Sequence, residues 1–181
     1  ISKLRVLDSS TYKERKLPAL PIGVVGGFQF SPDGQQLALS INTATSPSDV
    51  YVINLKSAEL TRWSQSEVGG LDSTTFIAPS LIRFKSFDGK EIPAFLYKPE
   101  GAGPFPVVIN IHGGPEAQAF PTFSPSIQYM LREMKVAVLV PNVRGSSGYG
   151  KNYLQLDNGF LRKDSVKDIG AFLDRLEADP A

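Results

Sequence analysis

The sequence predicts a mixed fold in two parts, an all-β part over residues 1–75 followed by an α/β part over residues 76–181. Two observations predict this division. Short segments of alternating apolar and polar residues, separated by turn residues, fill the first part, as expected for antiparallel strands. In the second part, short continuous apolar runs alternate with segments of helical periodicity, as expected for a sheet with crossover helices.

The sequence pattern of the first part predicts a four-stranded antiparallel sheet that resembles one blade of a β-propeller. The expected strands are residues 26–30, 35–41, 49–55 and 59–65. Ser31-Pro32-Asp33-Gly34 predicts the turn between the first two strands, because proline presets φ, aspartate accepts from the backbone ahead and glycine tolerates positive φ. Four strands within about 40 residues match the length of a propeller repeat. The alternative is a small antiparallel sheet packed on the second part.

The segment before these strands, residues 3–18, resembles the outer strands of a preceding blade. The first part is then expected to hold about one and a half blades, whereas a closed propeller has about 4 to 8. We therefore expect the faces of this sheet to lack the neighbouring blades that cover them in a propeller.

The second part begins with a predicted hairpin around the turn Phe87-Asp88-Gly89. Residues 107–111 and 136–145 are then expected to form strands that are buried on both faces of a parallel sheet, because both runs are apolar and rich in β-branched residues. Strands that alternate with helices predict right-handed crossovers.

Helical periodicity predicts two helices in this part, over residues 124–135 and 164–179. In the first helix we expect Ser124 as the cap and Pro125 as the first helical residue. The expected caps of the second helix are Asp164 or Ser165. The first apolar face is predicted to consist of Ile127, Met130, Leu131 and Met134. The second is predicted to consist of Val166, Ile169, Phe172, Leu173 and Leu176. A further strand is expected after Ala181.

Composition and charge argue against several functional classes. The 19 Lys and Arg residues against 18 Asp and Glu leave a net charge of +1, and no charged block indicates a nucleic-acid or membrane partner. There is no cysteine, and no apolar run approaches the roughly 20 residues of a membrane span. No cluster has metal-ligand spacing and no loop matches a nucleotide-binding pattern, so we expect no metal and no cofactor. A cytoplasmic location is the working expectation.

His112-Gly113-Gly114-Pro115 directly follows the apolar run of residues 107–111. Ligands bind at the carboxyl ends of strands in open α/β sheets, and adjacent glycines let backbone N–H groups approach a ligand with no Cβ in the way. In α/β-hydrolases, a His-Gly-Gly type loop after the third strand supplies a donor of the oxyanion hole, which stabilises the charge on a carbonyl oxygen under attack. The alternative is that Gly113 and Gly114 only make a tight turn.

His112 is the only histidine, but its position argues against a role as catalytic base. Triads of this fold run Ser, then Asp or Glu, then His, and His112 precedes any plausible nucleophile. We therefore expect it to orient its loop by hydrogen bonding. The stretch RGSSGYG does not match Gly-x-Ser-x-Gly, so Ser146 and Ser147 are expected to be loop residues. Arg144 is expected to form a structural ion pair, with binding of a substrate carboxylate as the alternative.

Several stretches together resemble the prolyl oligopeptidase family of serine peptidases, and within it the acylaminoacyl-peptidase and dipeptidyl-aminopeptidase-like branch. They are FDGKEIPAFLYKP, PVVINIHGGPEAQ, VLVPNVRGSSGYGK and DSVKDIGAFLDRL, and FQFSPDGQQLAL is similar to the blades that precede the hydrolase domain in that family. The resemblance implies that residues 1–75 are the C-terminal part of a β-propeller. Residues 76–181 are then the N-terminal part of an α/β-hydrolase domain that hydrolyses peptide bonds of oligopeptides.

The resemblance also implies how much of an active site these residues contain. The family's serine lies in a Gly-x-Ser-x-Gly turn on the following strand, with Asp and His further on, so nucleophile, acid and base are expected to be absent from this chain. Gly114 matches the position whose N–H serves in the oxyanion hole of the acylaminoacyl branch, with Gly113 beside it. His112 falls where other branches place a tyrosine. We therefore expect the chain to be inactive alone.

Two alternatives to a serine peptidase segment remain open, namely a segment of an α/β-hydrolase esterase and a non-catalytic interaction module. Propeller-like strands favour the peptidase, because simple esterases do not need them. The chain is expected to be an excised piece, a nicked fragment or a natural remnant. It is expected to bind the remainder of its enzyme or to self-associate through the blade side near Phe28 to Trp63, the sheet edge beside residues 136–140, and helix faces near Ile127 and Leu176.

Overall fold

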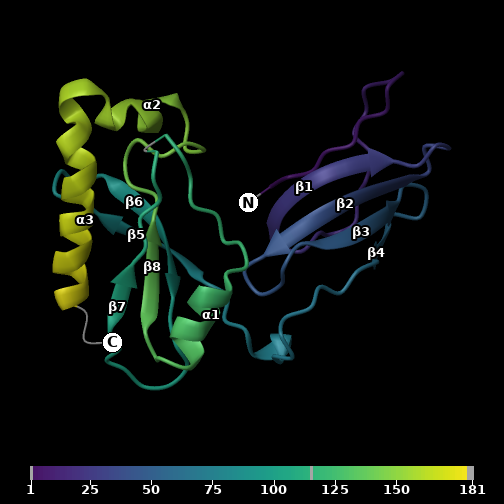
Figure 1. Ribbon diagram of the computed structural model, residues 1–181. Helices are drawn as coiled ribbons and strands as arrows, with labels where there is room; N and C mark the ends of the chain where they lie inside the picture. The colour runs from purple at the N-terminus through teal and green to yellow at the C-terminus, as the bar shows by residue number, and fades with distance from the viewer. Residues whose placement is uncertain (1, 115, 179–181) are drawn as a thin grey trace. The chain divides into compact units, whose positions relative to one another are not determined.

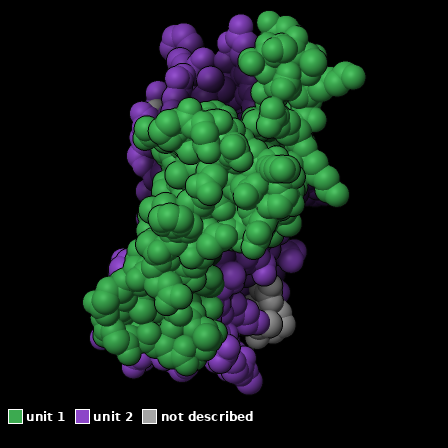
Figure 2. Space-filling view, turned by 90° about the vertical axis from the view of Figure 1, so that its right-hand side faces the viewer, with its two compact units in different colours: residues 1–76, 120–124 green, residues 77–119, 125–181 purple. Residues whose placement is uncertain are grey.

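The computed structural model describes residues 2–114 and 116–178, and the chain divides into two compact units. Unit 1 contains residues 1–76 and 120–124, and unit 2 contains residues 77–119 and 125–181 (Figure 2). In the part of the chain that the structure describes, each unit holds one four-stranded sheet. The fold is mixed, as predicted, because helices accompany the second sheet.

Unit 1 is built on an antiparallel sheet whose strands are neighbours in chain order. They are β1 (Gly23–Phe30), β2 (Gln36–Thr43), β3 (Asp49–Asn54) and β4 (Glu59–Arg62) (Figure 1). All four predicted strands are confirmed. The turn between β1 and β2 has the predicted chemistry, because the Asp33 carboxylate accepts a hydrogen bond from the Gln35 N–H at 3.0 Å and Gly34 has a φ of +66°.

One face of this sheet carries the core of unit 1, because alternate side chains of β2 and β3 point to it. The buried side chains of this core are Val6, Leu37, Leu39, Ile41, Tyr51 and Ile53. Leu37 stands opposite Ile53, and Leu39 stands opposite Tyr51, in the register of β2 and β3. These cross-strand pairs are the contacts that stabilise an antiparallel sheet.

Residues 3–18 do not form the strands that the sequence predicted. Among the described residues, this segment makes one isolated bridge, between Leu7 and Glu14. Its polar groups are satisfied locally instead, since the Asp8 carboxylate accepts a hydrogen bond from the Thr11 N–H at 2.9 Å. Alternation of apolar and polar residues produces a strand only where a neighbouring strand accepts and donates the ladder hydrogen bonds.

Unit 2 is built on a mixed sheet. In spatial order its strands are β5 (Ser80–Lys85), β6 (Glu91–Tyr97), β8 (Ala137–Pro141) and β7 (Val107–Ile109). The pairs β5–β6 and β6–β8 are antiparallel, so the predicted parallel sheet is limited to the pair β7–β8. The predicted hairpin turn is confirmed, with Gly89 at a φ of +80°.

The position of β8 inside this sheet contradicts the expected unpaired edge beside residues 136–140. All five residues of β8 are buried, because β6 and β7 pair with it on its two sides. In the described residues the edge is β7, whose Val107 and Val108 are 38% and 43% exposed. The prediction of a strand buried on both faces is therefore wrong for residues 107–111, of which only the first three belong to the strand.

Helical segments connect and flank the strands (Figure 1). They are η1 (Ser73–Thr75), α1 (Pro125–Arg132), α2 (Lys151–Leu154), η2 (Gln155–Asp157), η3 (Gly159–Leu161) and α3 (Arg162–Glu177). Within the described residues, no helix is both long and apolar enough to span a bilayer. The sequence predicted α1 and α3 but none of the shorter segments.

In α1, Pro125 is the first helical residue, as predicted. Ile127 and Leu131 are buried, which contradicts the expected half-covered face at Ile127. Met134 lies beyond the helix and is 55% exposed, so the predicted apolar face is shorter than expected. With eight residues, the helix makes about two turns.

The apolar face of α3 agrees with the prediction in part, because Phe172 is buried and Leu176 packs half-buried against the core of unit 2. The helix starts earlier than expected and its N-cap is Leu161, so neither Asp164 nor Ser165 caps it. Its buried residues are Ser165, Asp168 and Phe172. Val166 and Leu173, which were predicted to be covered, are 64% and 51% exposed. The buried side of α3 also carries a charged residue, Asp168, which forms an ion pair with Arg144.

Candidate functional site

The glycine loop, residues 110–119, leaves the sheet of unit 2 at the carboxyl end of β7. The Asn110 N–H donates to the Leu139 carbonyl at 2.8 Å and is the last ladder contact before the loop. Because β7 and β8 are parallel, the segment that follows β8 leaves the sheet at the same edge. The structure therefore brings together two loops that are far apart in the sequence, and such edges bind ligands in α/β sheets.

The two glycines of this loop differ in what their backbones allow. Gly114 has a φ of +132°, and a Cβ added there would lie 3.0 Å from the Ala117 Cβ and 3.1 Å from the Glu116 nitrogen. Gly113 has open space where a Cβ would be. Pro115, the last residue of the predicted motif, lies outside the described residues. Gly114 is thus the position at which the loop requires glycine.

His112 connects the glycine loop to the loop after β8. Its Nε2 lies 2.9 Å from Ser146 Oγ, and its Nδ1 lies 3.0 Å from the Gly113 carbonyl oxygen. The Gly113 carbonyl can only accept, so this contact needs the proton on Nδ1, and in a neutral imidazole Nε2 is then an acceptor. The Ser146 hydroxyl thus faces two acceptors, His112 Nε2 and the Val143 carbonyl at 2.6 Å, and His112 joins the two loops through it.

Ser146 and Ser147 lie in this second loop and have structural contacts. Ser146 is fully buried, and the Ser147 N–H donates to the Ala117 carbonyl at 2.8 Å. His112 Nδ1 faces the Gly113 carbonyl and not a carboxylate, so His112 and Ser146 lack the orienting acid of a triad. This agrees with the prediction that both serines are loop residues.

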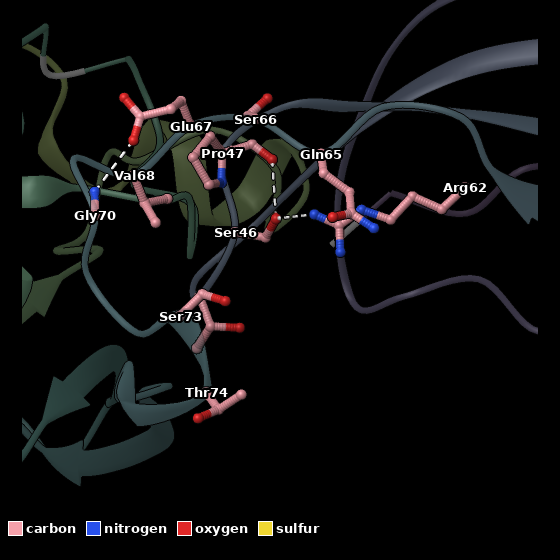
Figure 3. Close-up of a pocket in the computed structure, with 11 residues that line it drawn as sticks. Ser46, Pro47, Arg62, Gln65, Ser66, Glu67, Val68, Gly70, Ser73 and Thr74 are labelled. Carbon is pink, nitrogen blue, oxygen red and sulfur yellow. Dashed lines mark hydrogen bonds between the residues drawn. The ribbon is translucent and has the colours of Figure 1, made fainter.

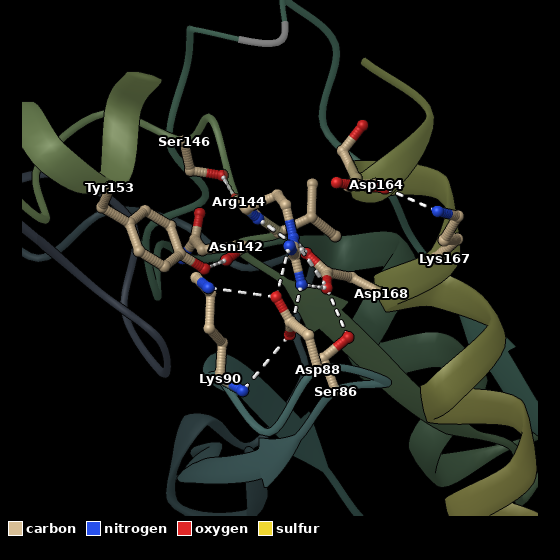
Figure 4. Close-up of polar contacts among 12 residues, drawn as sticks. Ser86, Asp88, Lys90, Asn142, Arg144, Ser146, Tyr153, Asp164, Lys167 and Asp168 are labelled. Carbon is tan, nitrogen blue, oxygen red and sulfur yellow. Dashed lines mark hydrogen bonds and ion pairs between the residues drawn. The ribbon is translucent and has the colours of Figure 1, made fainter. Parts of the chain in front are cut away.

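Arg144 is 2% exposed and lies at the centre of a polar network (Figure 4). Its Nη2 lies 2.7 Å from Asp168 Oδ1 and 3.0 Å from Asp88 Oδ1. Ser86 donates to the same Asp168 oxygen at 2.5 Å, and the guanidinium stacks 4.7 Å from the centre of the Phe87 ring. Hydrogen bonds from Arg144 hold the pKa of Asp88 well below its usual value. The guanidinium is therefore engaged in the structural ion pair that the sequence predicted.

Sequence reasoning missed Asn142, a fully buried polar residue directly after β8. Its side-chain oxygen accepts from the Ala119 N–H at 2.8 Å, and its side-chain nitrogen donates to the Ala119 carbonyl at 3.2 Å. The Tyr153 hydroxyl, whose pKa is raised by burial, donates to the Asn142 carbonyl at 2.7 Å. The sequence does contain a signal that could have identified Asn142, namely an amide residue immediately after a buried apolar strand.

A separate polar hollow of about 540 Å³ lies in unit 1 (Figure 3). Hydroxyl side chains, Gln65, Glu67 and Arg62 line it. Arg62 forms an ion pair with the buried Asp49, and Glu67 accepts from the Gly70 N–H at 3.1 Å. These charges are engaged in contacts within unit 1, so the hollow offers no paired acid and base for catalysis.

The side chains of residues 2–114 and 116–178 do not form a metal-binding site. No group of three or more His, Asp or Glu side chains there is close enough to hold an ion. The candidate functional site is therefore the glycine loop with the adjoining loop after β8, and the chemistry that it offers is hydrogen-bond donation from backbone N–H groups.

No protein-family model matches the chain. The uncharacterized peptidase YuxL of Bacillus subtilis is 29% identical over 160 residues, which are 86% of this chain and 24% of YuxL. Prolyl oligopeptidase A of Galerina marginata is 29% identical over 121 residues, which are 64% of this chain and 16% of that protein. The crystal structure of an acylaminoacyl peptidase of Pyrococcus horikoshii has a TM-score of 0.68 at 26% identity, over 93% of this chain and 27% of that one. The chain thus spans less than a third of each of these proteins.

Proposed function

The chain matches a segment of the prolyl oligopeptidase family of peptidases in sequence and in fold, and we propose that it is part of a serine peptidase that hydrolyses peptide bonds in oligopeptides. In this proposal, residues 1–75 are the C-terminal part of a β-propeller and residues 76–181 are the N-terminal part of an α/β-hydrolase domain. The acylaminoacyl or dipeptidyl-peptidase type of specificity is the finer form of the proposal, and the likeness to the Pyrococcus horikoshii protein supports it.

The glycine loop is the observation that carries this proposal. It follows a parallel strand, lies at the carboxyl edge of the sheet and contains a glycine at a φ of +132°. The proposed role of Gly114, with Gly113 beside it, is to donate backbone N–H hydrogen bonds to the oxygen of a carbonyl under attack. The proposed role of His112 is to orient this loop through Ser146. Nucleophile, acid and base are proposed to lie outside these 181 residues.

The experiment compares the full-length protein with the 181-residue chain. The full-length protein should hydrolyse fluorogenic acylaminoacyl or dipeptidyl peptides, and a fluorophosphonate should label one serine outside residues 1–181. The chain alone should show no hydrolysis above background, because it contains no ordered Ser–Asp–His set.

Two results of this experiment would contradict the proposal. Labelling of Ser146 or Ser147 would place a nucleophile in the second loop. Hydrolysis of activated esters without any hydrolysis of peptides would favour an esterase. Mass spectrometry of the labelled peptide and parallel assays with both substrate classes distinguish these results.

The proposed partners are an oligopeptide substrate and either the remainder of the same enzyme or further copies of this chain. The exposed edge strand β7 supports association, because an unpaired strand is a template for pairing. We also propose that the full-length protein is located in the cytoplasm. Fractionation of cells that express it tests this location.

A further inference from the structure

We propose that Asn142 is a positioning residue for the glycine loop. The inference concerns how the loop is held, and its catalytic consequence rests on the proposed function. Hydrogen-bond donors of an oxyanion hole are effective only when they are fixed before the reaction, because reorganisation during the reaction would cost rate. A loop of glycines has no stiffness of its own, so the surrounding residues must supply it.

The side-chain amide of Asn142 fits this task because it pairs with both backbone groups of one loop residue. Its oxygen accepts from the Ala119 N–H at 2.8 Å, and its nitrogen donates to the Ala119 carbonyl at 3.2 Å. This is the pair of contacts that a neighbouring strand would make. The far end of the glycine loop is thereby held at the end of β8, a strand that pairs with β6 and β7 on its two sides.

Asn142 is itself held by three further contacts of its own. Its N–H donates to the Pro93 carbonyl at 2.9 Å, and its carbonyl accepts from the Tyr153 hydroxyl at 2.7 Å. The second proton of its side-chain nitrogen goes to the Tyr149 hydroxyl at 3.0 Å. Together with Ala119, these partners satisfy every polar group of a fully buried residue. The amide therefore has one orientation, in which it presents an acceptor and a donor to the loop.

Other contacts hold the rest of the glycine loop to the same segment. His112 meets Ser146 at the near end, and the Ser147 N–H donates to the Ala117 carbonyl in the middle. Asn142 differs from these because its contact needs an acceptor and a donor on one side chain. Its replacement by Asp therefore keeps the size and removes the donor toward Ala119.

The test uses the full-length protein with Asn142→Ala and Asn142→Asp, and Asn152→Ala as the matched control. Asn152 lies in α2, outside both loops, and its side chain is exposed. Hydrogen exchange of the amides at 110–119 reports the loop directly, and kcat and KM with a peptide substrate report its consequence. Both Asn142 variants should exchange faster across 112–119 while the β5–β6 hairpin keeps its protection. They should lower kcat by about 10²-fold with a smaller change in KM, and the control should change neither.

Unchanged exchange in both Asn142 variants would overturn the proposal. Loss of protection throughout unit 2 in both variants would overturn it too, in favour of a general folding role. If the unsubstituted protein has no peptidase activity, the proposed function fails, whereas the exchange measurement still decides whether Asn142 positions the loop.

Discussion

Gly113 and Gly114 are adjacent, yet a methyl group has different consequences at each. Alanine at position 114 is strained at a φ of +132°, and its Cβ would press on Ala117, whereas the space beside Gly113 is open. Strain of this kind costs on the order of 1–3 kcal/mol and would move the Gly114 N–H.

We predict that Gly114→Ala in the full-length protein lowers kcat by about 10²–10³-fold, the loss typical of an oxyanion donor, with a smaller change in KM. Gly113→Ala should lower kcat less, because its backbone is not at positive φ and the space beside it is open. Steady-state kinetics with a peptide substrate measures both. Equal losses at the two positions would show that the loop responds to any added methyl group.

Asp49 makes the stability of unit 1 depend on pH. Burial opposes its charge, but hydrogen bonds from Ser64, Ser66 and Arg62 outweigh the burial and lower the pKa of Asp49 to about 2. A carboxyl group with a lowered pKa contributes stability above its unfolded pKa of about 3.9 and loses it as pH falls toward the folded value.

We therefore predict that the melting temperature falls between pH 4 and pH 2, and that about 2 kcal/mol of the loss comes from Asp49. In Asp49→Asn, which cannot titrate, the fall should be smaller, although the variant starts from a lower stability at pH 7. Thermal melts followed by circular dichroism at pH 7, 4 and 2 measure this. If the melting temperatures of the unsubstituted protein and of Asp49→Asn fall equally with pH, acidic groups other than Asp49 cause the loss of stability.

Helix α3 separates two neighbouring apolar residues that the sequence placed on one face. Phe172 is buried against Phe84 of β5, whereas Leu173 is 51% exposed. We predict that Phe172→Ala costs about 3–5 kcal/mol of unfolding free energy, because it leaves a cavity in the core of unit 2. Leu173→Ala should change it by no more than about 0.5 kcal/mol. Urea denaturation measures both, and similar losses would mean that partner chains cover Leu173.

Association between copies of the chain should depend on β7, because this strand has a described neighbour on one side only and exposes Val108. We predict that Val108→Lys lowers the apparent mass of the isolated chain toward that of a monomer, since a lysine on an edge strand discourages pairing. Light scattering after size-exclusion chromatography measures the mass. Val166→Lys on the exposed side of α3 is the control, and an equal effect there would indicate association through the helix.

Local patterns were sufficient to predict much of the fold. The strands of unit 1, the turns at Gly34 and Gly89 and the start of α1 at Pro125 each depend on residues a few positions apart. The glycine loop was found for the same reason, because His112, Gly113 and Gly114 are contiguous in the sequence. Backbone conformation, steric freedom and strand alternation are properties of short segments, and the sequence displays them directly.

Tertiary packing decided the rest. Whether β8 or β7 forms the edge depends on strand pairing between distant segments, which the apolar character of either strand does not encode. Asp168 lies on the buried side of α3 because Arg144, 24 residues earlier, pairs with it. Asn142 reaches Ala119 across 23 residues. A charge or an amide is buried only where a distant partner compensates the loss of water, so the roles of these residues emerge only in the folded chain.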